Sequence, residues 1–196
     1  MTKKNKHGII WCGIILASIL LDQLTKQLAI KHLAPIDTYP IIKDVLHLTY
    51  VTNYGAAFGI LADHRWIFLV ISTVAIVLLS CYLYYKRDAH PLLCTALSLI
   101  IGGGIGNMID RIVLGYVVDF VDFRLIHFAV FNTADTFVCI GCALIFLWLF
   151  LYAEFEDEKK GSPAKTNTVN PNIDTEKETE KPSSAAAEEH DDAADR

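Results

Sequence analysis

The chain has 196 residues, of which 53% are hydrophobic, and its mean hydropathy is +0.37. This composition argues against a soluble domain, and we expect no nucleic-acid partner. The net charge of −5 is unevenly spread, because the residues from Glu154 onward carry −7 and residues 1–153 carry +2. The excess of acidic residues therefore lies in the C-terminal tail, and we expect the residues before it to be embedded in a membrane.

The first apolar run, GIIWCGIILASILL at residues 8–21, follows the basic start MTKKNKH. A charged start and a short apolar core are typical of a signal peptide, but no Ala-x-Ala-like cleavage site follows. The helical pattern continues instead through DQLTKQLAI, where Asp22 and Lys26 are spaced to pair at i,i+4. We interpret residues 8–30 as a retained membrane helix.

Three further runs are long, apolar and uncharged: WIFLVISTVAIVLLSCYLYY, LLCTALSLIIGGGIGNMI and TFVCIGCALIFLWLFLYA. Each has about the length that a helix needs to cross the hydrocarbon core of a bilayer. In the third predicted helix, Gly102 and Gly106 are spaced at i,i+4 and allow a second helix to approach closely. The predicted spans are about 8–30, 66–86, 92–112 and 133–153.

Four spans place both termini on the same side of the membrane. The segments on that side hold seven lysines and arginines near the membrane, against four on the other side, or six with Lys26 and Arg111. The positive-inside rule therefore predicts cytoplasmic termini. Residues 31–65 and 115–131 are then extracytoplasmic, and the β-branched stretch VLHLTYVTN predicts a short strand or small sheet in the first of them.

The tail consists mainly of Glu, Lys, Thr, Pro, Ser and Ala, with scarcely an apolar side chain. Such a composition cannot bury enough apolar surface to offset the entropy of folding. We therefore expect two parts, a four-helix membrane domain at residues 1–155 and a disordered, acidic cytoplasmic tail at residues 156–196.

Metal-binding and nucleophile motifs are scarce. Cys139 and Cys142 form a C-x-x-C pair, which we interpret as two buried, small apolar side chains, since no second pair or histidine cluster completes a metal site. The chain has no His-x-x-x-His with an intervening Glu and no Gly-x-Ser-x-Gly. We expect no metal and no cofactor, and carboxylates are the remaining candidates for chemistry.

Ionisable side chains at membrane depth are costly and are functional candidates by default. The predicted topology brings all of them toward the outer face of the membrane: Asp22, Lys26, Asp110, Arg111, Asp119 and Asp135. Asp110 is adjacent to Arg111, which would stabilise its charged form and favours a supporting role.

Asp119 and Asp135 have no obvious local cation and lie on either side of the link between the last two spans. Two close carboxylates in a partly dry site would share a proton, so that one acts as general base while the other polarises a carbonyl. Alternatively, they cap helices or meet solvent, and spacing alone does not separate Asp119 from Asp122. A small proton-coupled carrier or binding protein is the alternative function.

Four stretches carry a family resemblance: LDQLTK (21–26), VTNYGAAFGI (51–60), GNMIDRIVLGYVVDFVDF (106–123) and FNTADTF (131–137). In this order and between four spans, they closely resemble the bacterial lipoprotein signal peptidases, or signal peptidase type II. The resemblance extends over roughly residues 8–153. It implies an α-helical integral membrane protein of four transmembrane helices with a small extracytoplasmic β-structured cradle formed by residues 31–65.

The resemblance implies that Asp119 and Asp135 form the catalytic pair of an aspartic endopeptidase. Residues at matching positions would shape and support the site: Asn53, Gly55, Asn107, Asp110, Arg111, Asn132, Ala134, Asp22 and Lys26. Among them, Asn53 and Asn132 can offer amide donors to the substrate backbone, and Arg111 can hold nearby loops.

The resemblance also implies the substrate and the location. The family removes signal peptides from diacylglyceryl-modified prolipoproteins, without a metal, at the outer face of the bacterial inner membrane. We accordingly expect a monomeric multi-pass protein with both termini in the cytoplasm, whose partners are these prolipoproteins and membrane lipids.

Overall fold

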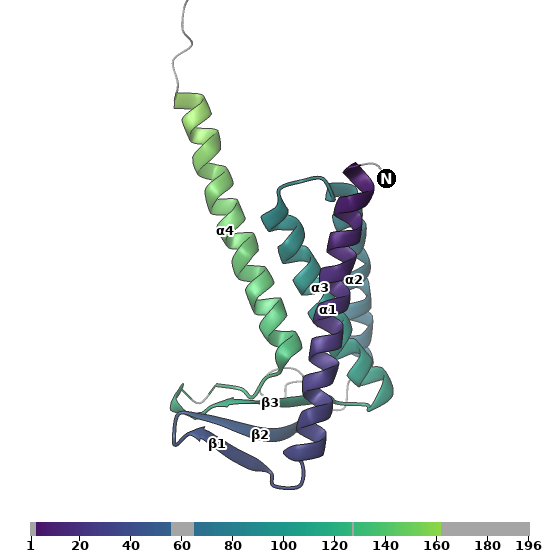
Figure 1. Ribbon diagram of the computed structural model, residues 1–196, viewed down its shortest axis with the longest axis vertical. Helices are drawn as coiled ribbons and strands as arrows, with labels where there is room; N and C mark the ends of the chain where they lie inside the picture. Colours follow the sequence, from purple (N-terminus) through teal and green to yellow (C-terminus); the bar gives the residue numbers. More distant parts are fainter. Residues whose placement is uncertain (1–2, 56–64, 127, 162–196) are drawn as a thin grey trace, which may run out of the picture. The chain divides into compact units, whose positions relative to one another are not determined.

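The computed structural model describes residues 3–55, 65–126 and 128–161. This part of the chain contains four long helices (Figure 1): α1 (Lys3–His32), α2 (Arg65–Lys86), α3 (Pro91–Val113) and α4 (Thr133–Gly161). All four contain a stretch long and apolar enough to cross a membrane. The four predicted spans are confirmed as helices.

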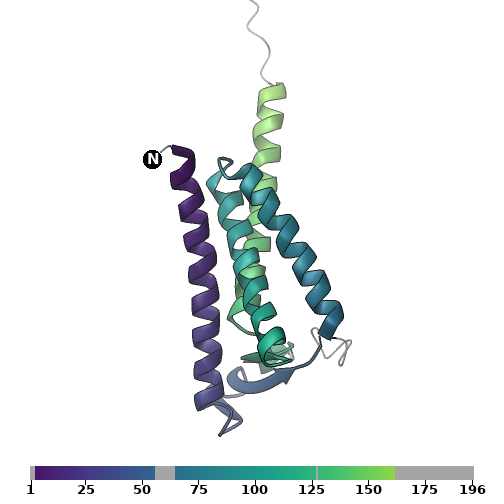
Figure 2. The same cartoon turned by 90° about the vertical axis from the view of Figure 1, so that its right-hand side faces the viewer.

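Helix α3 is the central helix, because α1, α2 and α4 all contact it. In Figure 2 it lies between α1 and α2, with α4 behind it. Half of the apolar stretch of α3 is buried (50%), whereas the corresponding stretch of α2 is only 6% buried. The other three helices therefore turn most of their apolar side chains away from the bundle, as expected for helices that face lipid.

Small residues let the helices approach α3 closely. Gly102 lies against Ser18 of α1, Gly106 lies against Asp22 of α1, and Gly103 lies against the backbone carbonyl of Ala134 in α4. A side chain at any of these positions would collide with its neighbour. The expected close approach at Gly102 and Gly106 is confirmed, and it brings α1 and α4 together around α3.

Gly103→Ala is expected to lower the free energy of unfolding by about 1–3 kcal/mol, because the new methyl group meets rigid backbone. Gly13→Ala is the matched control, since a methyl group at this position in α1 meets nothing within 4 Å. The control should be neutral or stabilising by up to about 1 kcal/mol. Unfolding of both variants in detergent checks this, and equal stabilities would contradict the close packing of α3 on α4.

The extramembrane part is a three-stranded antiparallel sheet in the order β1 (Thr38–Ile42), β2 (Leu46–Asn53) and β3 (Val117–Phe123). Asp44, with φ 61°, lies in the tight turn between β1 and β2. The predicted strand at residues 45–53 is confirmed as β2. The sheet is not confined to residues 31–65, however, because its third strand comes from residues 115–131, the second of the two segments predicted to be external.

The sheet is fixed to the end of α1 by apolar packing. Val118 of β3 is fully buried against Ala29 of α1 and Leu33, the residue that follows this helix, with Tyr116 and Phe120 beside it. Side chains alternate between the two faces of a strand, so the residues next to Val118 point the other way, toward α3 and α4. This packing sets the direction of Asp119.

The predicted boundary between the membrane domain and the tail needs one correction. Helix α4 continues to Gly161, so residues 156–161 are helical and do not belong to an irregular tail. The glutamates and lysines of this stretch have good helix propensity, which favours extension of the helix beyond the apolar span. The rest of the predicted tail, residues 162–196, lies outside the described residues.

Candidate active site

A buried lysine connects α1 to α3. The Nζ atom of Lys26 lies 3.0 Å from Asp22 Oδ2 and 3.0 Å from Asp110 Oδ2, and it donates to Asn107 Oδ1 at 2.8 Å. The lysine side chain is 1% exposed. The predicted pairing of Asp22 with Lys26 is confirmed, and the same ammonium group also neutralises a carboxylate from a second helix.

Asp110 does not rely on Arg111, its sequence neighbour. Besides Lys26, it accepts hydrogen bonds from Gln23 Nε2 at 2.9 Å and from the backbone N–H of Val118 at 3.1 Å. Adjacent helical residues point about 100° apart, which is why the neighbouring arginine is not the partner. Asp110 thus joins α1, α3 and β3, and Gln23 is a member of the site that the sequence analysis missed.

The N-terminus of α4 is held by carboxylates. Asp22 Oδ1 accepts from the backbone N–H of Ala134 at 2.9 Å. Asn132 and Asp135 form a reciprocal capping box, with Asp135 N donating to Asn132 Oδ1 at 3.0 Å and Asn132 N donating to Asp135 Oδ2 at 3.2 Å. The candidate catalytic Asp135 is therefore fixed at a helix N-terminus, where backbone N–H groups stabilise negative charge.

Asp119 accepts one hydrogen bond on each carboxylate oxygen. Asn132 Nδ2 donates to Oδ1 at 2.6 Å, and Asn53 Nδ2 donates to Oδ2 at 2.9 Å. The second N–H of Asn132 donates to Asn107 Oδ1 at 3.1 Å. Both amide protons of Asn132 are thus used within the protein, and the expected donation of Asn132 to the substrate backbone stays a prediction. Asn132 orients the carboxylate.

Asn107 connects the buried lysine to Asp135. Its Oδ1 accepts from Lys26, and its Nδ2 donates to Asp135 Oδ1 at 2.7 Å. Since the lysine can only donate, it fixes which end of the Asn107 amide faces Asp135. Lys26 does not line the cavity, yet through Asn107 it sets the orientation of Asp135, which does.

Asp119 and Asp135 line one cavity of about 210 Å³. The segment 128–131 forms another part of its wall, and so does Arg111, which donates to Gly55 O at 3.3 Å and to Asn107 O at 3.4 Å. The cavity thus contains a cation close to both carboxylates, although neither aspartate has one beside it in the sequence. Arg111 holds the end of β2 against α3, as expected from its donors.

Burial, together with the smaller effect of the negative charge of Asp135, raises the pKa of Asp119 to about 6 despite the hydrogen bond from Asn53. The hydrogen bond from Asn132 and the charge of Lys26 oppose this shift. A carboxyl group with this pKa beside a second carboxylate can hold a proton close to neutral pH. The arrangement provides what a shared-proton pair needs.

Asp122 lies on the opposite face of β3 from Asp119, since the two are an odd number of residues apart. It accepts from Thr49 Oγ1 at 2.8 Å and from Arg124 Nε at 2.9 Å. Burial by itself raises the pKa of Asp122, but the hydrogen bonds from Arg124 and Thr49 outweigh it and hold the pKa below its ordinary value. Asp122 therefore bridges strands at the surface.

The cysteine pair differs from expectation. Cys139 and Cys142 are both exposed on α4, not buried in the bundle. They lie within an apolar span, where exposed side chains face lipid, and Cys139 also reaches the edge of the cavity. Within residues 3–55, 65–126 and 128–161, no group of three or more His, Cys, Asp or Glu side chains is arranged to hold a metal ion.

Four membrane-length helices, with one carboxylate from α4 and one from the adjoining sheet in the same cavity, define a multi-pass membrane protein with an aspartic-peptidase type of site. The sequence model of the family described as Signal peptidase (SPase) II matches residues 14–151. The chain belongs to this family.

Individual relatives agree with this assignment. The chain is 50% identical to the lipoprotein signal peptidase of Halothermothrix orenii over 70% of this chain and 92% of the relative. It is 46% identical to that of Caldanaerobacter subterraneus over 71% and 94%, respectively. A solved bacterial membrane enzyme is 31% identical and superposes with a TM-score of 0.64 over 79% of this chain and 92% of that chain. These matches favour the peptidase hypothesis over the carrier.

Proposed function

We propose that the protein removes signal peptides from diacylglyceryl-modified prolipoproteins, using a water molecule activated between Asp119 and Asp135. The observation that carries the proposal is the convergence of these two carboxylates, from β3 and from the first turn of α4, on one cavity. Asn132 supports both groups, since its side chain binds Asp119 while its backbone N–H binds Asp135.

The environments of the two carboxylates suggest their roles. Asp135 accepts from Asn107 and from the backbone of Asn132 at a helix N-terminus, which holds its side chain in place for the role of general base. Asp119, with its raised pKa, carries the proton. Asp135 removes a proton from water, the resulting hydroxide adds to the peptide carbonyl, and Asp119 donates its proton to the carbonyl oxygen. Asp135 then donates the proton it took from water to the nitrogen, the C–N bond breaks as the carbonyl re-forms, and Asp119 takes a proton back from the hydroxyl group.

A lipid-bearing substrate suits the surroundings of the cavity. Phe128, Val130 and Phe131 form an apolar part of its wall, and Phe128 is also exposed at the surface (53%). We propose that the site faces the outer side of the bacterial inner membrane, with both termini in the cytoplasm, a topology that rests on the distribution of lysine and arginine.

We also propose that the peptidase domain ends with α4 and that the acidic remainder takes no part in cleavage. The support is that the family match stops at residue 151, before the acidic stretch begins.

The substrate proposal is tested with purified full-length protein in detergent and a synthetic prolipoprotein, either diacylglycerylated on its cysteine or unmodified. Cleavage immediately before the lipid-modified cysteine, with little or no cleavage of the unmodified peptide, is the expected result. Equal cleavage of both peptides would contradict the requirement for the lipid, and no cleavage by folded protein would contradict the proposed activity.

The pH dependence of cleavage should report the shared proton. If the singly protonated pair is the active form, kcat/KM falls as the pH rises through about 6, where Asp119 loses its proton. Asp122→Asn is the matched control on the same strand and should leave the profile unchanged, because Asp122 is directed to Arg124 and Thr49. A constant kcat/KM between pH 6 and 9 would show that the protonated Asp119 is not required.

A further inference from the structure

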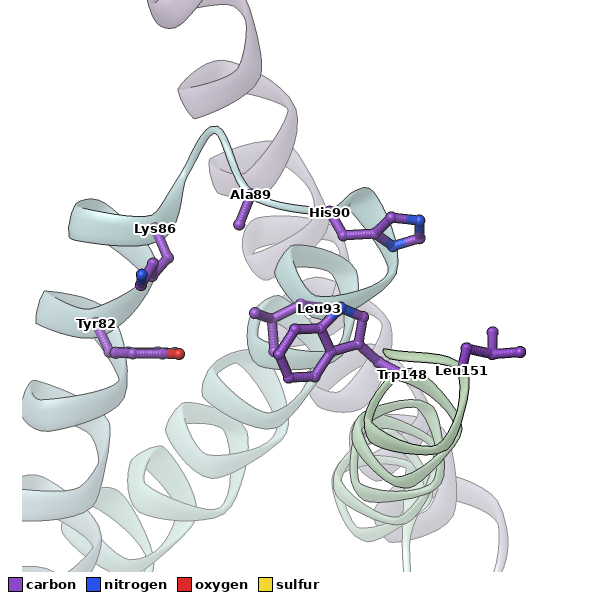
Figure 3. Close-up of a pocket in the computed structure, with 7 residues that line it drawn as sticks. All are labelled: Tyr82, Lys86, Ala89, His90, Leu93, Trp148 and Leu151. Carbon is purple, nitrogen blue, oxygen red and sulfur yellow. The ribbon is translucent and has the colours of Figure 1, made fainter. Parts of the chain in front are cut away.

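A second cavity, of about 480 Å³, lies between α2, α3 and α4, near the turn that joins α2 to α3 (Figure 3). It is distant from the candidate active site, because α3 begins at Pro91 beside this cavity and carries Arg111 at its other end. At about 1.5 Å a residue, this separation is roughly 30 Å of helix. The catalytic mechanism uses no residue of this second cavity.

The rim of the cavity is polar and basic. Figure 3 shows Tyr82 and Lys86 of α2 on one side and His90, at the start of α3, above the opposite side. His90 Nδ1 accepts from the backbone N–H of Leu92 at 3.3 Å, so the neutral ring carries its proton on Nε2. The lysine ammonium, the Nε2–H and the tyrosine hydroxyl are all hydrogen-bond donors suited to phosphate oxygens.

The remaining lining is apolar. Leu93 is buried between the helices, and Trp148 and Leu151 of α4 form the wall opposite Tyr82. None of the described residues that line the cavity is acidic. Asp88, in the turn that joins α2 to α3, lies 3.5 Å from His7 of α1. The cavity thus combines a cationic rim with apolar walls between membrane spans.

This combination selects an anionic lipid over a soluble anion. Lys86 is the last residue of a span whose apolar stretch is only 6% buried, so the rim lies where the hydrocarbon core ends. Basic pockets between membrane helices at this depth bind anionic lipid headgroups, and their apolar walls accept acyl chains. A free phosphate ion would make no use of the apolar wall formed by Leu93, Trp148 and Leu151.

We propose that this cavity is a binding site for an anionic phospholipid, with the headgroup phosphate at Lys86, the rest of the headgroup along the rim toward His90, and an acyl chain against the apolar wall that includes Trp148. The site is separate from the proposed cleavage reaction. In the orientation proposed above, it lies in the cytoplasmic leaflet, so the bound lipid anchors α2 to α4 on the side of the membrane opposite the peptidase site.

Trp148 provides the probe, because brominated acyl chains quench a nearby tryptophan. The Trp66→Phe background removes the exposed tryptophan of α2, and the remaining Trp11 is buried. Full-length protein in phosphatidylcholine vesicles is titrated with dibrominated phosphatidylglycerol or with dibrominated phosphatidylcholine. We expect quenching to show a preference of roughly fivefold or more for the anionic lipid, as one membrane-surface lysine contributes.

Lys86→Gln/His90→Gln is expected to abolish this preference, while quenching by the neutral lipid persists and shows that the cavity is intact. The matched control, Lys31→Gln/His32→Gln, removes the same residue types from the exposed end of α1 and should retain the preference. Three results would overturn the proposal: equal quenching by both lipids in the background protein, equal loss of preference in both double variants, or loss of the preference when millimolar inorganic phosphate is added.

Discussion

Asp119→Asn and Asp135→Asn are each expected to slow cleavage of the lipid-modified substrate by about 10²- to 10⁴-fold. Asparagine can neither remove a proton from water nor return one to the product, and general acid–base catalysis contributes about this factor. Mass spectrometry of the released signal peptide measures the rate. Because the two groups act as one unit, the double variant should be scarcely slower than either single variant.

The control for these variants is Asp122→Asn, which changes the same residue type three positions from Asp119 but outside the cavity. It should cleave within about a factor of two of the unmodified protein, since Asp122 does not line the cavity and its partly exposed ion pair with Arg124 contributes little. Undiminished cleavage by Asp119→Asn or by Asp135→Asn would remove that residue from the mechanism. If Asp122→Asn loses as much cleavage activity as Asp119→Asn and Asp135→Asn, all three losses result from damage to the fold.

Lys26→Met is expected to lower the free energy of unfolding by about 3–5 kcal/mol, the usual result of removing one partner from a buried ion pair. The substitution leaves Asp22 and Asp110 buried at 0% and 3% exposure without their shared cation. Lys31→Met, in the same helix but exposed, is the matched control and should change stability by less than about 0.5 kcal/mol. Unfolding in detergent compares the two.

A second substitution separates lost charge balance from lost packing. Adding Asp110→Asn to Lys26→Met removes one of the two uncompensated carboxylates and should restore part of the lost stability. If Lys26→Met is as stable as Lys31→Met, the buried network makes no net contribution. If the free energy of unfolding of the double variant is lower than that of the unmodified protein by the sum of the two single effects, the two side chains act independently. That result would contradict their 3.0 Å contact.

The spans were predictable because hydrophobicity and length are local properties of the sequence. Each of the four helices contains its predicted span, and the largest difference is the extension of α4 to Gly161. Strand β3 was missed although VVDFVDF is rich in β-branched and aromatic residues. Its partner, β2, lies far away in the sequence, and such long-range pairing leaves no local mark beyond propensity.

Individual residues of the site were predictable from the sequence, but the contacts between residues on different helices were not. The i,i+4 spacing was sufficient to pair Asp22 with Lys26, but the contact of Lys26 with Asp110 depends on how α1 packs on α3. The capping box was open to prediction, since Asn132 and Asp135 have the required spacing at the start of an apolar run. The odd spacing of Asp119 and Asp122 would also have separated their faces once the strand was recognised.

The pairing of Asp22 with Lys26 within one helix also bears on how the protein enters the membrane. Helix α1 is synthesised first, long before Asp110 is available, and an isolated lysine in a spanning segment opposes insertion. Because its counter-ion lies one turn away, α1 enters the bilayer with the positive charge already neutralised. When α3 is inserted next, Asp110 loses its bound water and pairs with the ammonium group of Lys26. Insertion of α4 then completes the cavity. The peptidase site therefore forms only after the last span has been inserted, so that partly inserted chains have no assembled site.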